Sequence, residues 1–214
     1  MRRAMVVGVS GNIGKLLVQK LVNNKMYRFI IVFTRINERK FKHIHIKKVI
    51  VDFKQINQYQ ASFLEADEVF CLLGSNYSSD KLLEDAAQLD YEIPLAVAQM
   101  SKAGGVNRFV LVNPHCEHNH SSPYLKRRWQ LEKEIAALGF EDFKVFRVNQ
   151  IAIAKKWMSV RKKLKLVYIN LMRLTGRKIE GYLQVPANIL VEDMANWVIQ
   201  QPELLNSNHP IQKK

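Results

Sequence analysis

The sequence predicts an α/β fold in which helices cover both faces of a doubly wound parallel β-sheet. Short apolar segments alternate with longer segments of helical periodicity from the N-terminus to about residue 148, which is the pattern of repeated β-α-β units. The 214 residues, 48% hydrophobic and 24% charged, suffice for one hydrophobic core. No apolar run approaches the ~20 residues of a membrane span. We therefore expect a single domain over residues 1–205, with a substrate-side helix and strand at about 150–190, and a polar tail over 206–214.

The first predicted strand, Ala4–Val7, runs into a turn with three glycines at three-residue intervals, Gly8, Gly11 and Gly14. Apolar residues then recur at helical spacing over 13–21. Glycines at such a turn allow tight bending and bring main-chain N–H groups at the positive end of the helix close to a phosphate. The pattern therefore predicts a dinucleotide site, although a plain structural turn would also use glycine. The residues predicted to line this site are Gly8, Ser10, Gly11, Asn12, Ile13 and Gly14.

The remaining elements follow in alternation. Five further strands are expected, at residues 29–33, 49–51, 69–73, 108–112 and 143–148. A long helical region ends at Gly104-Gly105, and Pro94 starts or kinks its second part. Another helix is expected over about 123–138, and the chain closes with a strand at 182–185 and a helix at about 191–200. Because ligands of parallel sheets bind beyond the carboxyl ends of the strands, the residues after each strand are candidates for the site.

The residues after the second and third strands indicate which dinucleotide is bound. Thr34 and Arg35 follow the second strand, and no acidic residue appears until Glu38. An acid at this place holds the ribose 2′-hydroxyl of NAD, whereas arginine suits the 2′-phosphate of NADP, so the sequence favours NADP(H) over NAD(H). Asp52 and Phe53 follow the third strand, where the acid could meet the adenine amino group and the ring could pack on the base. A strand-end turn with a core aromatic is the alternative.

Four segments in order resemble a known family: "VVGVSGNIG", "VFCLLGS", "AGGVNRFVLVN" and "YLKRRWQLEKEI". They are similar to the atypical short-chain dehydrogenase/reductases, especially the branch of Tat-interacting-protein-like, NAD(P)H-binding members, and the resemblance runs from about Met5 to Gln201. It implies a Rossmann-like fold with bound NADP(H). The residues that it implies for the cofactor site are Gly8, Gly11, Gly14, Arg35, Asp52, Leu73 and Gly74.

The chemistry of this family rests on a Tyr-x-x-x-Lys pair with a serine upstream. The resemblance implies that Tyr124 is the proton donor, since a neighbouring cation lowers the pKa of a phenol enough for it to act near neutrality. Arg128 stands at the lysine position, where it keeps the charge and can bind the ribose, but arginine is larger and cannot be deprotonated. Asn113 stands in place of the serine, and its amide can donate a hydrogen bond to a substrate carbonyl.

Two functions follow from these residues. One is an NADP-dependent reductase of a small carbonyl or quinone-like substrate, with a modified Tyr-xxx-Arg site. The other is a catalytically silent NADP(H)-binding protein that senses redox state or binds a partner. A cytoplasmic location is expected for both. A third alternative is a peripheral membrane protein that keeps the nucleotide as a structural ligand.

A basic segment carries much of the formal net charge of +14. Residues 143–179 contain eleven lysines and arginines and no acidic residue. Within it an apolar stripe at helical spacing comprises Trp157, Val160, Leu164, Val167, Leu171 and Leu174. Packing of this stripe on the sheet, with a solvated basic face, is the interpretation we favour. The alternative is that Lys155–Lys165 binds an anionic membrane or an acidic partner. Nucleic acid binding has no supporting motif.

The loop 115–120 carries three histidines, a cysteine and a glutamate, all of them transition-metal ligand types. Structural zinc sites usually take ligands from two separated segments, and no second half is evident, so no metal site is predicted. We expect instead a solvated loop near the nicotinamide, with His115 or Cys116 touching substrate. Cys71 and Cys116 lie far apart without a C-x-x-C motif, which suits free thiols in a reducing compartment.

Overall fold

A computed structural model describes residues 1–35, 41–74, 87–114, 122–148, 151–152 and 185–199, and the structural statements below concern these residues. The main sheet has six parallel strands in the order β3-β2-β1-β4-β5-β6. They are β1 Arg2–Val7, β2 Tyr27–Thr34, β3 Ile46–Ile50, β4 Glu68–Cys71, β5 Arg108–Pro114 and β6 Asp142–Val148. The predicted doubly wound parallel sheet is confirmed.

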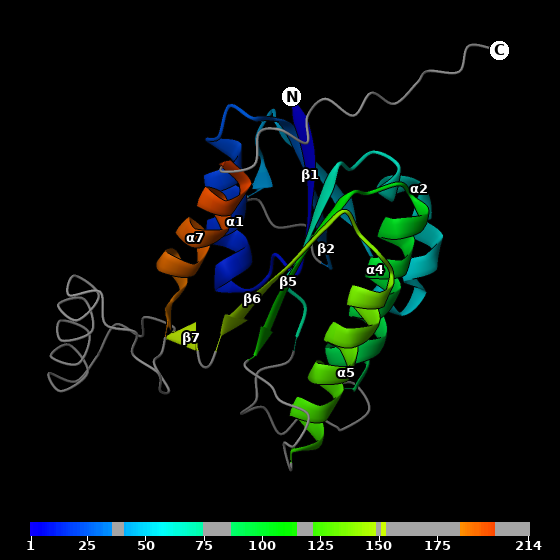
Figure 1. The fold of residues 1–214 in the computed structure, drawn as a ribbon. Helices are drawn as coiled ribbons and strands as arrows, with labels where there is room; N and C mark the ends of the chain where they lie inside the picture. The colour runs from blue at the N-terminus through cyan, green and yellow to red at the C-terminus, as the bar shows by residue number, and fades with distance from the viewer. Residues whose placement is uncertain (36–40, 75–86, 115–121, 149–150, 153–184, 200–214) are drawn as a thin grey trace, which may run out of the picture.

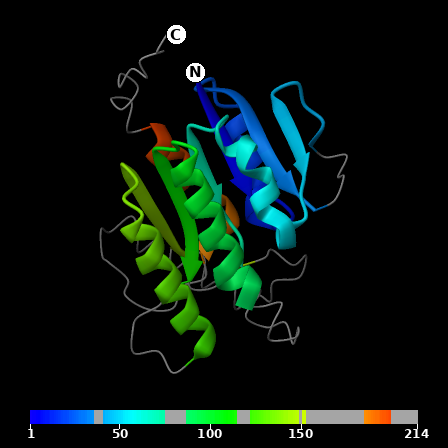
Figure 2. The same ribbon diagram turned by 90° about the vertical axis from the view of Figure 1, so that its right-hand side faces the viewer.

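Helices cover both faces of this sheet (Figure 1). One face carries α1 Asn12–Val22 and α7 Ala187–Ile199, which pack on each other. The opposite face, turned toward the viewer in Figure 2, carries the 3-10 helix η2 Phe53–Tyr59, α2 Gln60–Phe63, the π-helical turn η3 Gln88–Glu92, α4 Ile93–Ala103 and α5 Pro123–Ala137. A separate pair of short parallel strands joins β7 Ile151–Ala152 to β8 Val185–Pro186. None of the helices among the described residues is long and apolar enough to cross a membrane.

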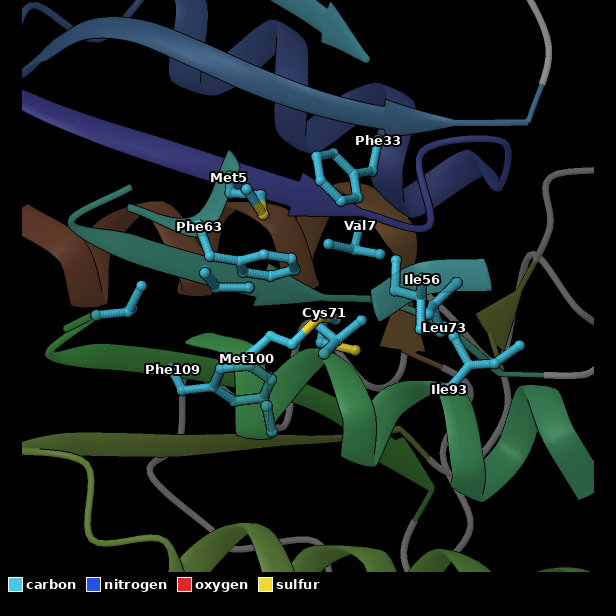
Figure 3. Packing of buried hydrophobic residues seen from close by; sticks show 14 of the residues in the cluster. Met5, Val7, Phe33, Ile56, Phe63, Cys71, Leu73, Ile93, Met100 and Phe109 are labelled. Atoms are coloured by element: carbon cyan, nitrogen blue, oxygen red, sulfur yellow. The ribbon is translucent and has the colours of Figure 1, made fainter. Parts of the chain in front are cut away.

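The core consists of two apolar clusters, one on each face of the sheet. Alternate residues of β1 enter different clusters, with Met5 and Val7 facing α4 and Val6 facing α1. Figure 3 shows the α4-side cluster, in which Phe33 meets Phe63 edge to face with ring centroids 5.5 Å apart. Because the central strands are buried on both faces, they are continuous apolar runs, and this is why the sequence reveals them.

Several observed boundaries differ from the predicted ones. β1 and β2 each begin two residues earlier than predicted, and β5 ends two residues later. β3 begins at Ile46 and ends at Ile50, and β4 ends at Cys71, because the next three residues form the turn beyond it. Pro94 lies in the first turn of α4, where a missing N–H is tolerated, and the wider turn of η3 precedes it. The last helix begins at Ala187, four residues before the predicted start.

Several predictions concern residues outside the described ranges. They are the loop 115–120, the basic helix with Lys155–Lys165, most of the strand at 182–185 and the tail 206–214. These stay predictions.

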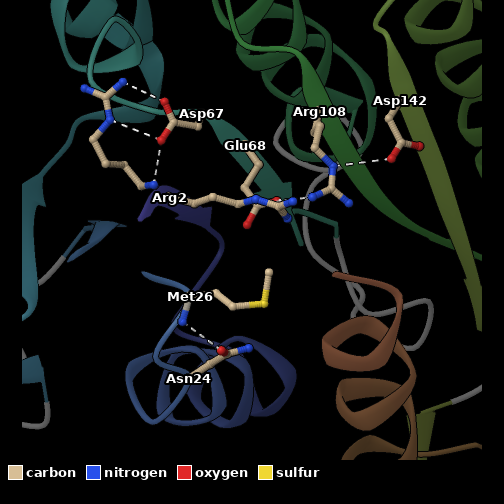
Figure 4. Close-up of polar contacts among 8 residues, drawn as sticks. Arg2, Asn24, Met26, Asp67, Glu68, Arg108 and Asp142 are labelled. Atoms are coloured by element: carbon tan, nitrogen blue, oxygen red, sulfur yellow. Dashed lines mark hydrogen bonds and ion pairs between the residues drawn. The ribbon is translucent and has the colours of Figure 1, made fainter. Parts of the chain in front are cut away.

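A buried ion-pair network lies across the amino ends of the strands (Figure 4). Glu68 on β4 is fully buried, and Arg108 on β5 donates to its carboxylate with Nη1 and Oε2 3.1 Å apart. The same arginine donates from Nε to Asp142 on β6 at 3.3 Å, and Arg2 on β1 lies 4.0 Å from Glu68. The register places these residues side by side, and Trp197 of α7 stacks over the Arg108 guanidinium at 4.4 Å. Buried charged side chains therefore fill the amino edge, and the carboxyl edge is where ligands of parallel sheets bind.

Candidate dinucleotide site

The turn after β1 contains two glycines that the fold itself requires. Gly8 has φ +97°, and a Cβ there would lie 2.8 Å from the carbonyl carbon of Leu72. A Cβ on Gly14 would lie 2.6 Å from Val9 Cα and 2.7 Å from the Gly8 carbonyl oxygen. Glycine at position 8 lets the main chain after β4 approach the turn, and glycine at position 14 lets the start of α1 pack against it.

Gly11 differs from the other two glycines. A Cβ on it would meet only the Gly8 oxygen, at 3.9 Å, so the described residues do not crowd this position. Its φ of −76° is one that any residue adopts. Gly11 is thus unexplained by backbone strain or packing, and it is exposed together with Ser10 and Asn12. A ligand that approaches the main chain at this point would account for it.

The N-terminus of α1 is built to receive an anion. Gly11 is its N-cap, and within the described part of the chain no side chain caps the helix and no acid lies in its first turn. The first N–H groups of a helix lack intrahelical acceptors and carry a partial positive charge. The strand order also reverses at β1, and ligands of open parallel sheets bind at such a switch point. The residues present therefore fit the diphosphate of a dinucleotide.

The ends of β2 and β3 lie together at the same edge. The Val51 N–H donates to the Thr34 carbonyl oxygen at 2.9 Å, and Arg35, which follows Thr34, is exposed. Asp52 is exposed and caps η2, since its Oδ1 accepts from the Lys54 N–H at 3.0 Å. Phe53 is 8% exposed and belongs to the α4-side core. Its position agrees with the core-aromatic alternative, while the exposed Asp52 keeps access to a ligand.

Arg128 occupies an unexpected position. Its side chain is 1% exposed, and the guanidinium points inward from α5. Nη1 donates to the carbonyl oxygens of Leu73 at 3.2 Å and Asp90 at 3.1 Å. Nη2 donates to the Val112 carbonyl at 2.8 Å, and Nε donates to Asn113 Oδ1 at 2.7 Å. These bonds join the turn after β4, η3 and the end of β5 to a single side chain.

Asn113 is likewise turned inward. It is fully buried at the end of β5, and its Nδ2 donates to the Arg128 carbonyl at 3.1 Å and to Glu132 Oε2 at 3.0 Å. An amide nitrogen has two hydrogens, so both are used within the protein. Glu132 in turn accepts from Arg147 on β6. Sequence reasoning missed Glu132, because its partners Asn113 and Arg147 lie on β5 and β6 and no local spacing links them to α5.

Tyr124 lies in the first turn of α5 and is partly exposed. It stands one helical turn before Arg128, at the carboxyl edge of the sheet. Beneath this edge, Cys71 is completely buried as a free thiol, and burial raises its pKa to about 11. This cysteine is therefore a protonated part of the core near neutrality.

Comparisons with known proteins agree with this geometry. Residues 8–138 match the model of a family described as NAD(P)H-binding. The chain is 25% identical to Protein HTATIP2 of Rattus norvegicus over 152 residues, which cover 68% of this chain and 61% of the rat protein. The chain thus spans about three fifths of that relative's length.

Solved structures show the same fold at low identity. The Bordetella bronchiseptica enzyme WbmH in complex with NAD⁺ superposes with a TM-score of 0.63 at 18% identity, covering 94% of this chain and 71% of WbmH. The UDP-glucose 4-epimerase of Thermotoga maritima superposes with a TM-score of 0.62 at 17% identity, covering 89% of this chain and 71% of the epimerase. The matched family region includes both the glycine turn and Arg128.

Proposed function

Because the chain belongs to the NAD(P)H-binding family, we propose that it binds NADP(H) across the carboxyl edge of its sheet. The observation that carries this proposal is the open position at Gly11, on the uncapped N-terminus of α1. With the diphosphate at this point, the adenosine half extends over the ends of β2 and β3. The nicotinamide half extends the other way, over Leu73, Gly74 and the start of α5.

Arg35 is the residue that we expect to select NADP(H). It is exposed directly after β2, where the adenosine ribose is bound in sheets of this order, and the next acid in the sequence is Glu38. A guanidinium there can form charge-assisted hydrogen bonds with a 2′-phosphate, which NAD(H) lacks.

Replacing Arg35 by alanine is expected to weaken NADPH binding about tenfold or more and to leave NADH binding unchanged, since a charge-assisted hydrogen bond contributes ~1.5–3 kcal/mol. Isothermal titration calorimetry with both nucleotides measures this. Arg28→Ala is the matched control, because Arg28 is exposed on the same strand but at its amino end. Equal weakening for both nucleotides would show that Arg35 does not hold the 2′-phosphate.

Reduction of a small carbonyl or quinone-like substrate is a second candidate function, and the position of Tyr124 favours it. The cofactor would supply the hydride, and the Tyr124 hydroxyl would donate the proton to the carbonyl oxygen. The inward hydrogen bonds of Asn113 and Arg128 instead favour the silent binder, because both hydrogens of the Asn113 amide are used within the protein and the amide does not donate to a substrate carbonyl.

Tyr124→Phe separates these two candidates. In a reductase, it is expected to lower NADPH oxidation by at least about a hundredfold and to leave the Kd for NADPH unchanged, because general acid catalysis contributes 10²–10⁴-fold. NADPH absorbance with a panel of aldehydes, ketones and quinones is the measurement. A wild-type protein that binds NADPH and consumes none with any of them would rule against the reductase.

A further inference from the structure

We propose that Arg128 is a positioning residue of the dinucleotide site, which holds the turn after β4 against the glycine turn after β1. The inference rests on the proposed binding of NADP(H) and assigns to this arginine a role other than touching the substrate. We also infer that a lysine, the residue found at this position in the family's motif, cannot fill this role of Arg128.

The first step is the contact between the two turns. The positions that a Cβ on Gly8 would overlap belong to the Leu72–Leu73 peptide, at 2.8 Å, 3.0 Å and 3.1 Å. The Leu72 N–H also donates to the Val7 carbonyl at 2.8 Å. The glycine turn therefore rests directly on the main chain that follows β4. A displacement of that main chain would move the place where the diphosphate is proposed to bind.

The second step is the hold of Arg128 on that main chain. Its Nη1 donates to the Leu73 carbonyl, which belongs to the residue packed on Gly8. The guanidinium also lies beneath Gly74, since a Cβ on Gly74 would be 3.7 Å from Cζ and both Nη atoms. The remaining bonds anchor the guanidinium to η3 and to the end of β5. The turn after β4 is thereby fixed both to η3 and to the end of β5.

The third step concerns the shape of the side chain. The acceptors of Arg128 lie on separate segments, and the planar guanidinium reaches them from three different nitrogens. A lysine has a single nitrogen and cannot reach all these positions at once. At 1% exposure, water does not replace the lost donors, so buried carbonyl oxygens would lose the hydrogen bonds that the guanidinium makes.

The fourth step links the two departures from the family's motif. Arg128 Nε donates to Asn113 Oδ1, and Asn113 Nδ2 donates back to the Arg128 carbonyl. The residues at the serine and lysine positions are thus each other's partners. Their substitutions should be coupled, because changing either one leaves the other with unmade hydrogen bonds.

The test compares whole dinucleotides with a fragment in Arg128→Lys. The Kd values of NADPH, NADH and adenosine 2′-monophosphate are measured by calorimetry, beside thermal unfolding. We expect NADPH and NADH to bind about tenfold or more weakly by similar factors, as expected when a buried hydrogen-bond set is broken. The monophosphate has no 5′-phosphate and so reaches neither the glycine turn nor the turn after β4, and its Kd should change by less than about threefold. Arg127→Lys, the same change one residue earlier, should leave all three unchanged.

Different failures point to different errors. A wild-type protein that binds none of the three probes overturns the proposed function, and this inference with it. An Arg128→Lys protein that binds both dinucleotides as the wild type does, or that loses all three probes equally, overturns the positioning role alone. If Arg128→Lys does not fold, Asn113→Ser is the second variant. It removes the Nε acceptor and the two hydrogen bonds that Asn113 Nδ2 donates, but it keeps the bond from Arg128 to the Leu73 carbonyl, so it should show the same pattern with a smaller loss. Unchanged dinucleotide affinity in that folded variant also overturns the role.

Coupling is measured by adding the double variant Asn113→Ser, Arg128→Lys. Its loss of dinucleotide affinity should be smaller than the product of the two single losses, because both single variants break the same hydrogen bond from Arg128 Nε to Asn113 Oδ1 and the double variant loses it only once. Losses that multiply would show that the two residues act independently and would remove the link between them.

Discussion

Gly14→Ala is expected to lower the free energy of unfolding by about 3 kcal/mol, since overpacking a tightly packed site costs 1–3 kcal/mol and sometimes more. The new methyl would lie 2.6 Å from Val9 Cα and 2.7 Å from the Gly8 oxygen. Both are main-chain atoms in the turn between β1 and α1, so neither can move aside as a flexible side chain does. For a chain of this length the melting temperature should fall by about 6–12 °C, which thermal unfolding followed by circular dichroism measures.

Gly11→Ala is the matched control for this experiment. Its methyl would enter open space, with the nearest atom at 3.9 Å, so the stability should change by less than about 1 kcal/mol. NADPH affinity should nevertheless fall, because the methyl occupies the space assigned to the diphosphate. An unstable Gly11→Ala protein, or a stable one with wild-type NADPH affinity, would contradict the division between glycines that serve the fold and the glycine that serves the ligand.

The sequence predicts the glycine turn, but it does not predict which of the three glycines serves the fold and which serves the ligand. The spacing of Gly8, Gly11 and Gly14 predicts a tight strand-to-helix turn, because few other patterns need three glycines there. It does not tell which glycine is required by packing. That depends on the approach of Leu72, a residue that lies more than fifty positions later in the sequence.

The strands were predictable for a related reason. β1, β2, β4 and β5 are buried on both faces and form apolar runs that need no tertiary information to recognise. β3 is an edge strand with two lysines among its five residues, and its boundaries were predicted less well. An edge strand is only partly covered by the rest of the protein, so polar residues interrupt its apolar run and its ends are harder to recognise in the sequence.

The roles of Asn113 and Arg128 could not be read from the sequence. A motif position says which residue faces the cofactor in the family, but it does not say where a different residue will direct its hydrogen bonds. Here Leu73, Asp90 and Val112 supply the acceptors from three segments that only the fold brings together. To hold the ribose, as the resemblance implies, the Arg128 guanidinium would have to give up some of these hydrogen bonds.

Arg108→Met is expected to destabilise the protein by about 3–5 kcal/mol, the cost of leaving a buried charge without its partner. Among the described residues, the cation left beside Glu68 would be Arg2, whose nitrogen is 4.0 Å away. Methionine retains an unbranched apolar chain beneath Trp197, so most of the loss should come from the carboxylate and not from a cavity. Urea-induced unfolding at pH 7 measures the loss.

Arg3→Met provides the comparison on β1. Arg3 pairs with Asp67 at 2.6 Å, a shorter distance than that between Arg108 and Glu68, but its side chain and that of Asp67 are 37% and 40% exposed. An exposed pair contributes 0–1 kcal/mol, so this variant should remain close to the wild type. A similar loss in both variants would show that burial does not decide the effect.

The pH dependence of the stability loss in Arg108→Met tests whether the Glu68 carboxylate causes that loss. Burial raises the pKa of Glu68, while Tyr27, Arg108 and Arg2 act to lower it. A carboxyl whose folded pKa is raised contributes most stability below its unfolded pKa of ~4.3 and loses that contribution as the pH rises through the folded pKa. Removing Arg108 should raise the folded pKa further. The stability gap between Arg108→Met and the wild type should therefore be smallest near pH 4 and widen toward pH 7. A gap that is constant with pH would mean that lost packing, and not the buried carboxylate, causes the instability.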